Sequence, residues 1–174
     1  VPAPTASQIP DAVGIAFACN LRKAPIVPIA YCSVDTTAEA DFFEGIHFAA
    51  QHQLPVIFIC EQDCSPNDTH PPHIQGIELP AGLTHQRVDG CDIVTVYTAM
   101  QHAMQHARSG QGPILLEMSV TRLDPPSQVQ QDDEASNDPL TRCQHYLLTH
   151  DLWDETWAQE LHTLFSMEVE RAMQ

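Results

Sequence analysis

The sequence contains few basic residues. It has 7 lysines and arginines against 23 aspartates and glutamates, which gives a formal net charge of −16 over 174 residues. A surface this negative repels the phosphate backbone of nucleic acids and the headgroups of anionic lipids. The composition therefore argues against nucleic acid and against membrane surfaces as partners.

Long apolar runs and paired-cysteine motifs are also missing. No apolar stretch reaches the roughly 18 residues that a membrane-spanning helix needs, and residues 1–10 lack the basic-then-apolar layout of a signal peptide. The six cysteines form no CxxC pair. Because 43% of the residues are hydrophobic, the chain can build a core without a disulfide framework, and we expect a reducing, intracellular location.

No Walker loop, GxGxxG or GxSxG motif is present. Three residue pairs could in principle carry metal or redox chemistry: His102 with His106, His70 with His73, and Cys60 with Cys64. The first pair has the i,i+4 spacing of zinc ligands but no HExxH glutamate, so two histidines on a polar helix face are the simpler interpretation. The second lies in a proline-rich loop, where solvated side chains are expected. The third shows no histidine nearby that would activate a thiol.

Short apolar runs alternate along the chain with longer amphipathic stretches. The runs at residues 26–32 and 56–60 are near-continuous and rich in β-branched residues, which is typical of strands covered on both faces. Residues 114–118 form a third such run, and the short stretch at 85–88 is a weaker fourth candidate. The amphipathic stretches predict helices at residues 9–23, 39–53 and 92–110, the last with Asp92 as its N-cap. This alternation predicts an α/β domain with a parallel sheet and helices on both faces.

The last third of the chain has a different pattern. Residues 124–137 are rich in proline, glutamine and acids and predict a surface loop. Two helices are expected after it, from residue 138 to about 150 and from 152 to the end, the second with Trp153 and Trp157 on one apolar face. Docking of this face on its own domain is the default interpretation, and docking on a partner is the alternative. We therefore divide the chain into an α/β domain (1–123), the loop (124–137) and a helical extension of the same domain (138–174).

Several blocks of sequence resemble one family in the family's own order. They are SQIPDAVGIAFACNLRK (residues 7–23), EADFFEGIHFAAQHQLPVIFICE (39–61), RVDGCD (87–92), VYTAMQHAMQHARSGQGPILLEMSVTRL (96–123), DPLTRCQHYLL (138–148) and LWDETWAQEL (152–161). The family is the alpha subunit of the thiamine-diphosphate-dependent decarboxylating component of 2-oxoacid dehydrogenase complexes, of the pyruvate or branched-chain type. The resemblance implies a three-layer thiamine-diphosphate-binding fold.

The same resemblance implies an activity, partners and a location. The family decarboxylates a 2-oxoacid oxidatively and transfers the acyl group to a lipoyl carrier, with thiamine diphosphate supplying the reactive carbanion. Its cofactor lies between an alpha and a beta subunit, so the implied partner is a beta-subunit-like chain or a second copy of this one. The implied location is the bacterial cytoplasm or, in a eukaryote, the mitochondrial matrix.

The resemblance also places the cofactor site. Family members hold the diphosphate through Mg²⁺, whose oxygen ligands come from a GDG motif at a strand end and from the second residue of an NN pair. In this sequence GDG aligns with Ser33-Val34-Asp35, and NN aligns with Gln62-Asp63. The resemblance therefore assigns six positions to the cofactor: Ala3, Thr5, Ser33, Val34, Asp35 and Thr36. It assigns Asp63 and the backbone of Ser65 to the metal.

The spacing of this motif is kept, but its ligands are not. Val34 stands where the family has its metal-binding aspartate, and an isopropyl group has no lone pair to offer. Ser33 and Asp35 replace two glycines, and a carboxylate at residue 35 repels phosphate. The run RLDPPS (residues 122–127) lacks the phosphate-binding histidine of the family. We therefore expect that the chain alone does not hold the cofactor or turn over.

Three alternatives remain open from the sequence. The chain can be a non-catalytic scaffold that keeps the oligomerisation surfaces of the family. It can be a divergent enzyme whose missing residues come from an upstream segment or from another chain. Finally, a one-residue slip at a local bulge could bring Asp35, Glu39 and Asp63 together as an acidic cluster that holds a cation, although solvated acids at a sheet edge are the simpler interpretation.

Overall fold

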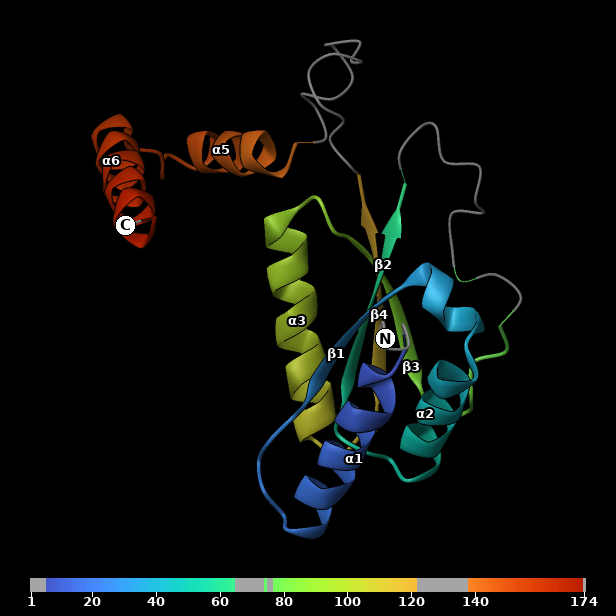
Figure 1. Cartoon of the computed structure of the whole chain (residues 1–174). Helices are drawn as coiled ribbons and strands as arrows, with labels where there is room; N and C mark the ends of the chain where they lie inside the picture. Colours follow the sequence, from blue (N-terminus) through green and yellow to red (C-terminus); the bar gives the residue numbers. More distant parts are fainter. Residues whose placement is uncertain (1–5, 65–73, 75–76, 122–137, 174) are drawn as a thin grey trace.

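The structure is a computed structural model that describes residues 6–64, 74, 77–121 and 138–173. These residues form a sheet of four parallel strands in the order β1-β2-β4-β3 (Figure 1). The strands are β1 (Ile29–Ser33), β2 (Ile57–Asp63), β3 (Thr84–Asp89) and β4 (Ile114–Val120). The central strands β2 and β4 have the most continuous apolar sequences, because both of their faces are covered.

Helices cover both faces of the sheet. The helices α1 (Gln8–Leu21) and α2 (Ala40–Gln51) pack on one face, and α3 (Ile93–Arg108) packs on the other (Figure 1). Each face has its own core cluster, centred on Phe58 and Leu115 under α1 and α2, and on Ile59 and Leu116 under α3. The three-layer α/β architecture predicted from the sequence is therefore confirmed.

The boundaries of the predicted elements agree with the observed ones to within three residues, and two differences bear on the site. The first strand begins at Ile29 rather than at residue 26, and Pro28 just before it has no amide hydrogen to give to a neighbouring strand. After this strand the chain forms a short 3₁₀ helix, η1 (Val34–Ala38), which the sequence analysis did not predict. Residues 33–36, the aligned cofactor motif, therefore span the end of β1 and the beginning of η1.

Residues 122–137, which include the loop predicted at 124–137, lie outside the described part of the chain. Two helices follow them. They are α5 (Pro139–Thr149) and α6 (Glu155–Ala172), capped at their N-termini by Asp138 and Asp154. Neither helix has a buried residue, and Figure 1 shows α6 standing away from the sheet. The expected docking of the last helix on its own domain is therefore wrong for this structure.

The prediction that Trp153 and Trp157 both lie on the last helix is also wrong. Trp153 precedes α6 and does not belong to its apolar stripe. Its ring meets that of Trp157 edge-on, with the centroids 6.4 Å apart, a spacing usual for aromatic pairs. Its indole nitrogen donates a hydrogen bond to Glu155. Among the described helices, none combines the length and the apolar character that crossing a membrane requires.

Candidate functional site

The predicted cofactor positions gather at the carboxyl edge of the sheet. The strands β1 and β2 are parallel neighbours, with Ser33 opposite Glu61, so that η1 begins close to where β2 ends at Asp63. In parallel α/β sheets ligands bind beyond the carboxyl ends of the strands, which is where these residues lie. Three other predicted positions, Ala3, Thr5 and Ser65, lie outside the described residues.

Val34 faces the protein rather than the solvent. Its side chain is half-buried and packs against the core cluster under α1 and α2. The two threonines that follow are buried, and their hydroxyls donate to backbone carbonyls of the same turn, Thr36 to Ser33 at 2.7 Å and Thr37 to Val34 at 2.6 Å. This turn is therefore stabilised by the apolar contact of Val34 with the core and by hydrogen bonds between its own residues.

The acidic residues near this turn do not form a cation site. Asp35 is exposed and Asp63 is half-buried at the end of β2. Among the described residues, which include Asp35, Glu39 and Asp63, no three histidine, cysteine or acidic side chains converge as metal ligands. The acidic cluster considered from the sequence is therefore not formed here.

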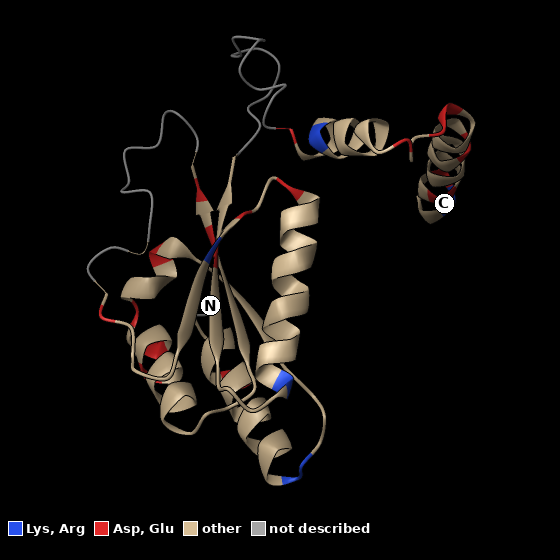
Figure 2. Cartoon of the chain, turned by 180° about the vertical axis from the view of Figure 1, so that it is seen from behind, with Lys and Arg blue, Asp and Glu red and all other residues tan. Residues whose placement is uncertain are grey.

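Charge is distributed unevenly along the sheet axis. Figure 2 shows acidic residues near the carboxyl ends of the strands, whereas Arg22 and Lys23 after α1 and Arg108 at the end of α3 lie at the opposite end. Negative charge at the strand ends opposes the binding of a diphosphate unless cations are supplied. The described cations close to this edge are Arg87 and Arg142, and both contact carboxylates.

A charged cluster on β3 and β4 was missed by the sequence analysis. Glu117, on the central strand β4, is only 1% exposed, and its carboxylate accepts from His85 at 2.8 Å and from the backbone amide of Ile74 at 3.0 Å. Arg87 lies 3.5 Å from the same carboxylate. A single acid within the apolar run ILLEM was the available signal, because a buried carboxylate needs partners.

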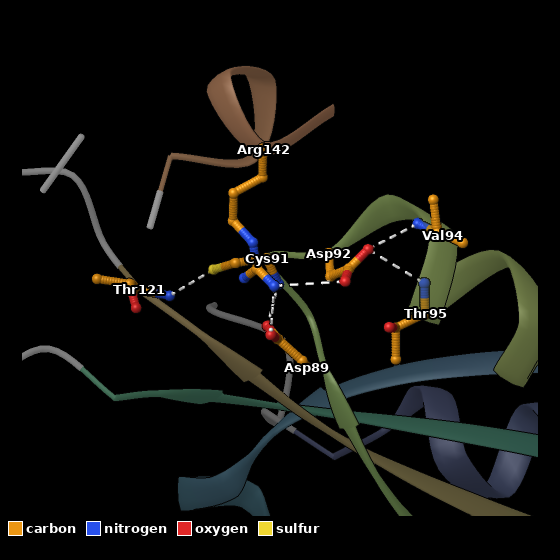
Figure 3. A network of polar contacts seen from close by, with 7 residues as sticks. All are labelled: Asp89, Cys91, Asp92, Val94, Thr95, Thr121 and Arg142. Carbon is orange, nitrogen blue, oxygen red and sulfur yellow. Dashed lines mark hydrogen bonds and ion pairs between the residues drawn. The ribbon is translucent and has the colours of Figure 1, made fainter. Parts of the chain in front are cut away.

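A second polar network joins α5 to the turn between β3 and α3 (Figure 3). Nη2 of Arg142 lies 2.8 Å from Asp89 and 3.3 Å from Asp92. Asp92 caps α3 by accepting from the amides of Val94 and Thr95, as the sequence predicted. The bond from the Thr95 amide is the main reason why the pKa of Asp92 lies below its ordinary value, and the cation of Arg142 lowers this pKa further.

The remaining candidate pairs do not form sites. His102 is exposed, but His106 lies on the buried side of α3 with Nε2 3.3 Å from the Thr84 hydroxyl, so its assignment to a polar face is wrong. His70 and His73 lie outside the described residues. Cys60 is buried inside the sheet, whereas Cys64 follows its end.

Comparison with known proteins identifies the ancestry of this arrangement. A sequence model of the family described as "Dehydrogenase E1 component" matches residues 2–174. The chain is 32% identical to the 2-oxoisovalerate dehydrogenase subunit alpha of Bacillus subtilis, over 97% of the chain and 57% of that protein. It is 30% identical to the pyruvate dehydrogenase E1 component subunit alpha of Staphylococcus aureus, over 89% of the chain and 46% of that protein.

A human protein also matches in sequence, and a solved structure shares the fold. The chain is 32% identical to the mitochondrial 2-oxoisovalerate dehydrogenase subunit alpha of Homo sapiens, over 89% of the chain and 39% of that protein. An X-ray structure described as a thiamin diphosphate-dependent enzyme of Mycobacterium smegmatis superposes with a TM-score of 0.50 at 21% identity, over 69% of this chain and 23% of that one, which supports the fold alone. The chain thus spans about half the length of these sequence relatives, and it belongs to the dehydrogenase E1 component family, as an alpha-type domain of 2-oxoacid dehydrogenases.

Proposed function

We propose that this chain is an E1 alpha-type domain that does not hold thiamine diphosphate by itself and is therefore non-catalytic alone. The observation that carries the proposal is the packing of Val34 against the core, at the position that aligns with the metal-binding aspartate of the family. A valine packed in this way supplies no oxygen to Mg²⁺, and among the described residues no group of three histidine, cysteine or acidic side chains takes its place.

Two further features support this proposal. The hydroxyls of Thr36 and Thr37 already donate to carbonyls of their own turn, so these hydrogens are not available to a diphosphate oxygen. Asp35 is exposed beside this turn, and its carboxylate repels a diphosphate. The whole-family reaction, oxidative decarboxylation of a 2-oxoacid with transfer of the acyl group to a lipoyl carrier, would then require a cation site completed by residues from elsewhere.

Isothermal titration of the chain with thiamine diphosphate in the presence of Mg²⁺ tests the proposal. We expect no binding at micromolar concentrations of cofactor, whereas a dissociation constant in the micromolar range or tighter would contradict it. Circular dichroism of the same sample shows that the protein is folded. A titration with thiamine diphosphate and EDTA in place of Mg²⁺ is the matched control, because binding through a cation disappears there.

The second candidate function is a partner-binding scaffold, and the uncovered apolar face of α6 favours it. Trp157, Leu161, Leu164 and Phe165 are each about half exposed or more on this helix. Exposed apolar faces of this kind are typical of surfaces that bind another chain. Analytical ultracentrifugation of the isolated chain, and of its mixture with a beta-subunit-like chain, would support the scaffold by showing association. A monomer that stays monomeric in both samples would contradict it.

A further inference from the structure

Two cysteine side chains meet between the neighbouring strands β1 and β2. Cys32 and Cys60 are register partners in this parallel pair, and both belong to the core cluster under α1 and α2, so they point to the same face of the sheet. Each of the two thiols is the largest single influence on the pKa of the other. Neighbouring strands lie about 4.8 Å apart, which falls within the roughly 4.4–6.8 Å that a disulfide needs between its Cα atoms.

The two thiols are not equivalent. The neighbouring thiol of Cys60 is the main reason why the pKa of Cys32 lies below its ordinary value, against the opposing effect of burial. The neighbouring thiol of Cys32, together with burial and the nearby carboxylates of Glu117 and Glu61, raises the pKa of Cys60. Cys32 is also the more accessible thiol, at 6% exposure against 0% for Cys60. Both differences favour Cys32 over Cys60 as the attacking thiol.

We propose that Cys32 and Cys60 form an oxidisable dithiol site, which a small peroxide converts into a disulfide between β1 and β2. In the first step the Cys32 thiolate attacks one oxygen of hydrogen peroxide; the O–O bond breaks, and a sulfenic acid and water are formed after one proton is taken up. In the second step the Cys60 sulfur attacks the sulfenyl sulfur, and its hydroxyl leaves as water with the Cys60 proton. Overall, two thiols and one peroxide give one disulfide and two waters.

This site lies directly beneath the carboxyl edge. Cys32 immediately precedes Ser33 at the end of β1, and Cys60 lies three residues before Asp63 at the end of β2. A disulfide here would tie together the two strand ends that carry the aligned cofactor positions. The inference rests on the register and burial of the two thiols and does not depend on whether this edge binds a cofactor.

The test is to treat the folded protein with hydrogen peroxide, unfold it, alkylate the remaining thiols and map the peptides by mass spectrometry. We expect a linked peptide pair containing Cys32 and Cys60, with alkylated cysteines falling from six to four, and full recovery of six after dithiothreitol. Recovery of both cysteines as separate alkylated peptides, or of the link only when oxidation follows unfolding, would overturn the proposal.

Variants resolve the order of the two steps. Cys60→Ser should abolish the link and leave a sulfenic acid on Cys32 that dimedone traps. Cys143→Ser is the matched control, because this half-buried cysteine lies on α5, and its variant should form the link as the parent does. If Cys60→Ser does not fold, the peptide map of the unchanged protein still decides the question. A dimedone adduct on Cys60 but not on Cys32 in the parent protein would contradict the assigned order.

Discussion

On the side of β3 and β4, charged side chains join the two strands to each other and the turn after β3 to α5, whereas beyond β1 and β2 the carboxyl edge is closed by a valine and two threonines. On the first side, Glu117 meets His85 and Arg87, and Asp89 meets Arg142. On the second, Val34 packs on the core. The comparison shows that one half of a sheet can keep structural charge while, in the other half, the described residues bring no three histidine, cysteine or acidic side chains together for a cation.

The largest effect is expected in the charged half, at Glu117. Glu117→Ala removes a carboxylate that is 1% exposed and leaves the amide of Ile74 without its acceptor, so we expect the free energy of unfolding to fall by about 3 kcal/mol. Urea denaturation followed by circular dichroism measures this loss. Glu61→Ala, at an exposed position of β2, is the matched control and should change stability by less than about 0.5 kcal/mol. Equal effects of the two variants would contradict the assigned role of Glu117.

A smaller loss is expected in the apolar half, at Val34. Val34→Asp replaces a side chain that packs on the core with a carboxylate that loses hydration there, so the free energy of unfolding should fall by about 2 kcal/mol. Ser33→Asp, at the exposed neighbouring position, should have little effect. Thermal unfolding of both variants, with and without Mg²⁺, measures the loss of stability. If Val34→Asp were as stable as the parent, the side chain would not be packed as described.

The next effect concerns the cap of α3. Asp92→Ala removes the acceptor for the amides of Val94 and Thr95 and should cost about 1 kcal/mol. Because the pKa of Asp92 in the folded protein is lowered, its carboxylate stabilises the fold at neutral pH, and this contribution is lost as the pH falls below about 4. Asp92→Asn keeps a capping oxygen but no charge. Urea denaturation at pH 7 and pH 3 should therefore show a smaller acid loss in the Asn variant than in the parent, and an equal loss would argue against this assignment.

The smallest effect on global stability is expected at Arg142. Its ion pairs with Asp89 and Asp92 are partly exposed, so Arg142→Ala should lower the free energy of unfolding by less than about 1 kcal/mol. Amide hydrogen exchange should nevertheless become faster throughout α5, because this residue joins the helix to the β3–α3 turn. Arg108→Ala leaves these contacts in place and should not change exchange in α5. Unchanged exchange in both variants would show that the ion pairs do not anchor the helix.

The sequence predicted the regular elements well, because their signals are local. The apolar runs of β2 and β4 and the amphipathic pattern of α3 appear within one window of the chain, and Asp92 caps the amides two and three residues later. The 3₁₀ turn at residues 34–38 was missed, since five residues are too few to show a period. Val34 is the first residue of this turn and directly follows the end of β1.

What the sequence could not provide was the partner of each buried polar group. Glu117 and His85 are 32 residues apart in the chain, and only the pairing of β3 with β4 brings them together. Cys32 and Cys60 meet for the same reason, through the register of β1 with β2. The burial of His106 likewise depends on which side of α3 faces Thr84, a choice that its i,i+4 spacing to His102 does not reveal.

The most direct test of the account is a crystal structure grown with thiamine diphosphate and magnesium at millimolar concentrations. We predict that Val34 keeps its contact with the core and that no metal-bridged diphosphate occupies the space beyond β1 and β2. Electron density for such a group, held by the backbone of residues 33–36 and by Asp63, would contradict the account, although membership of the family would stand.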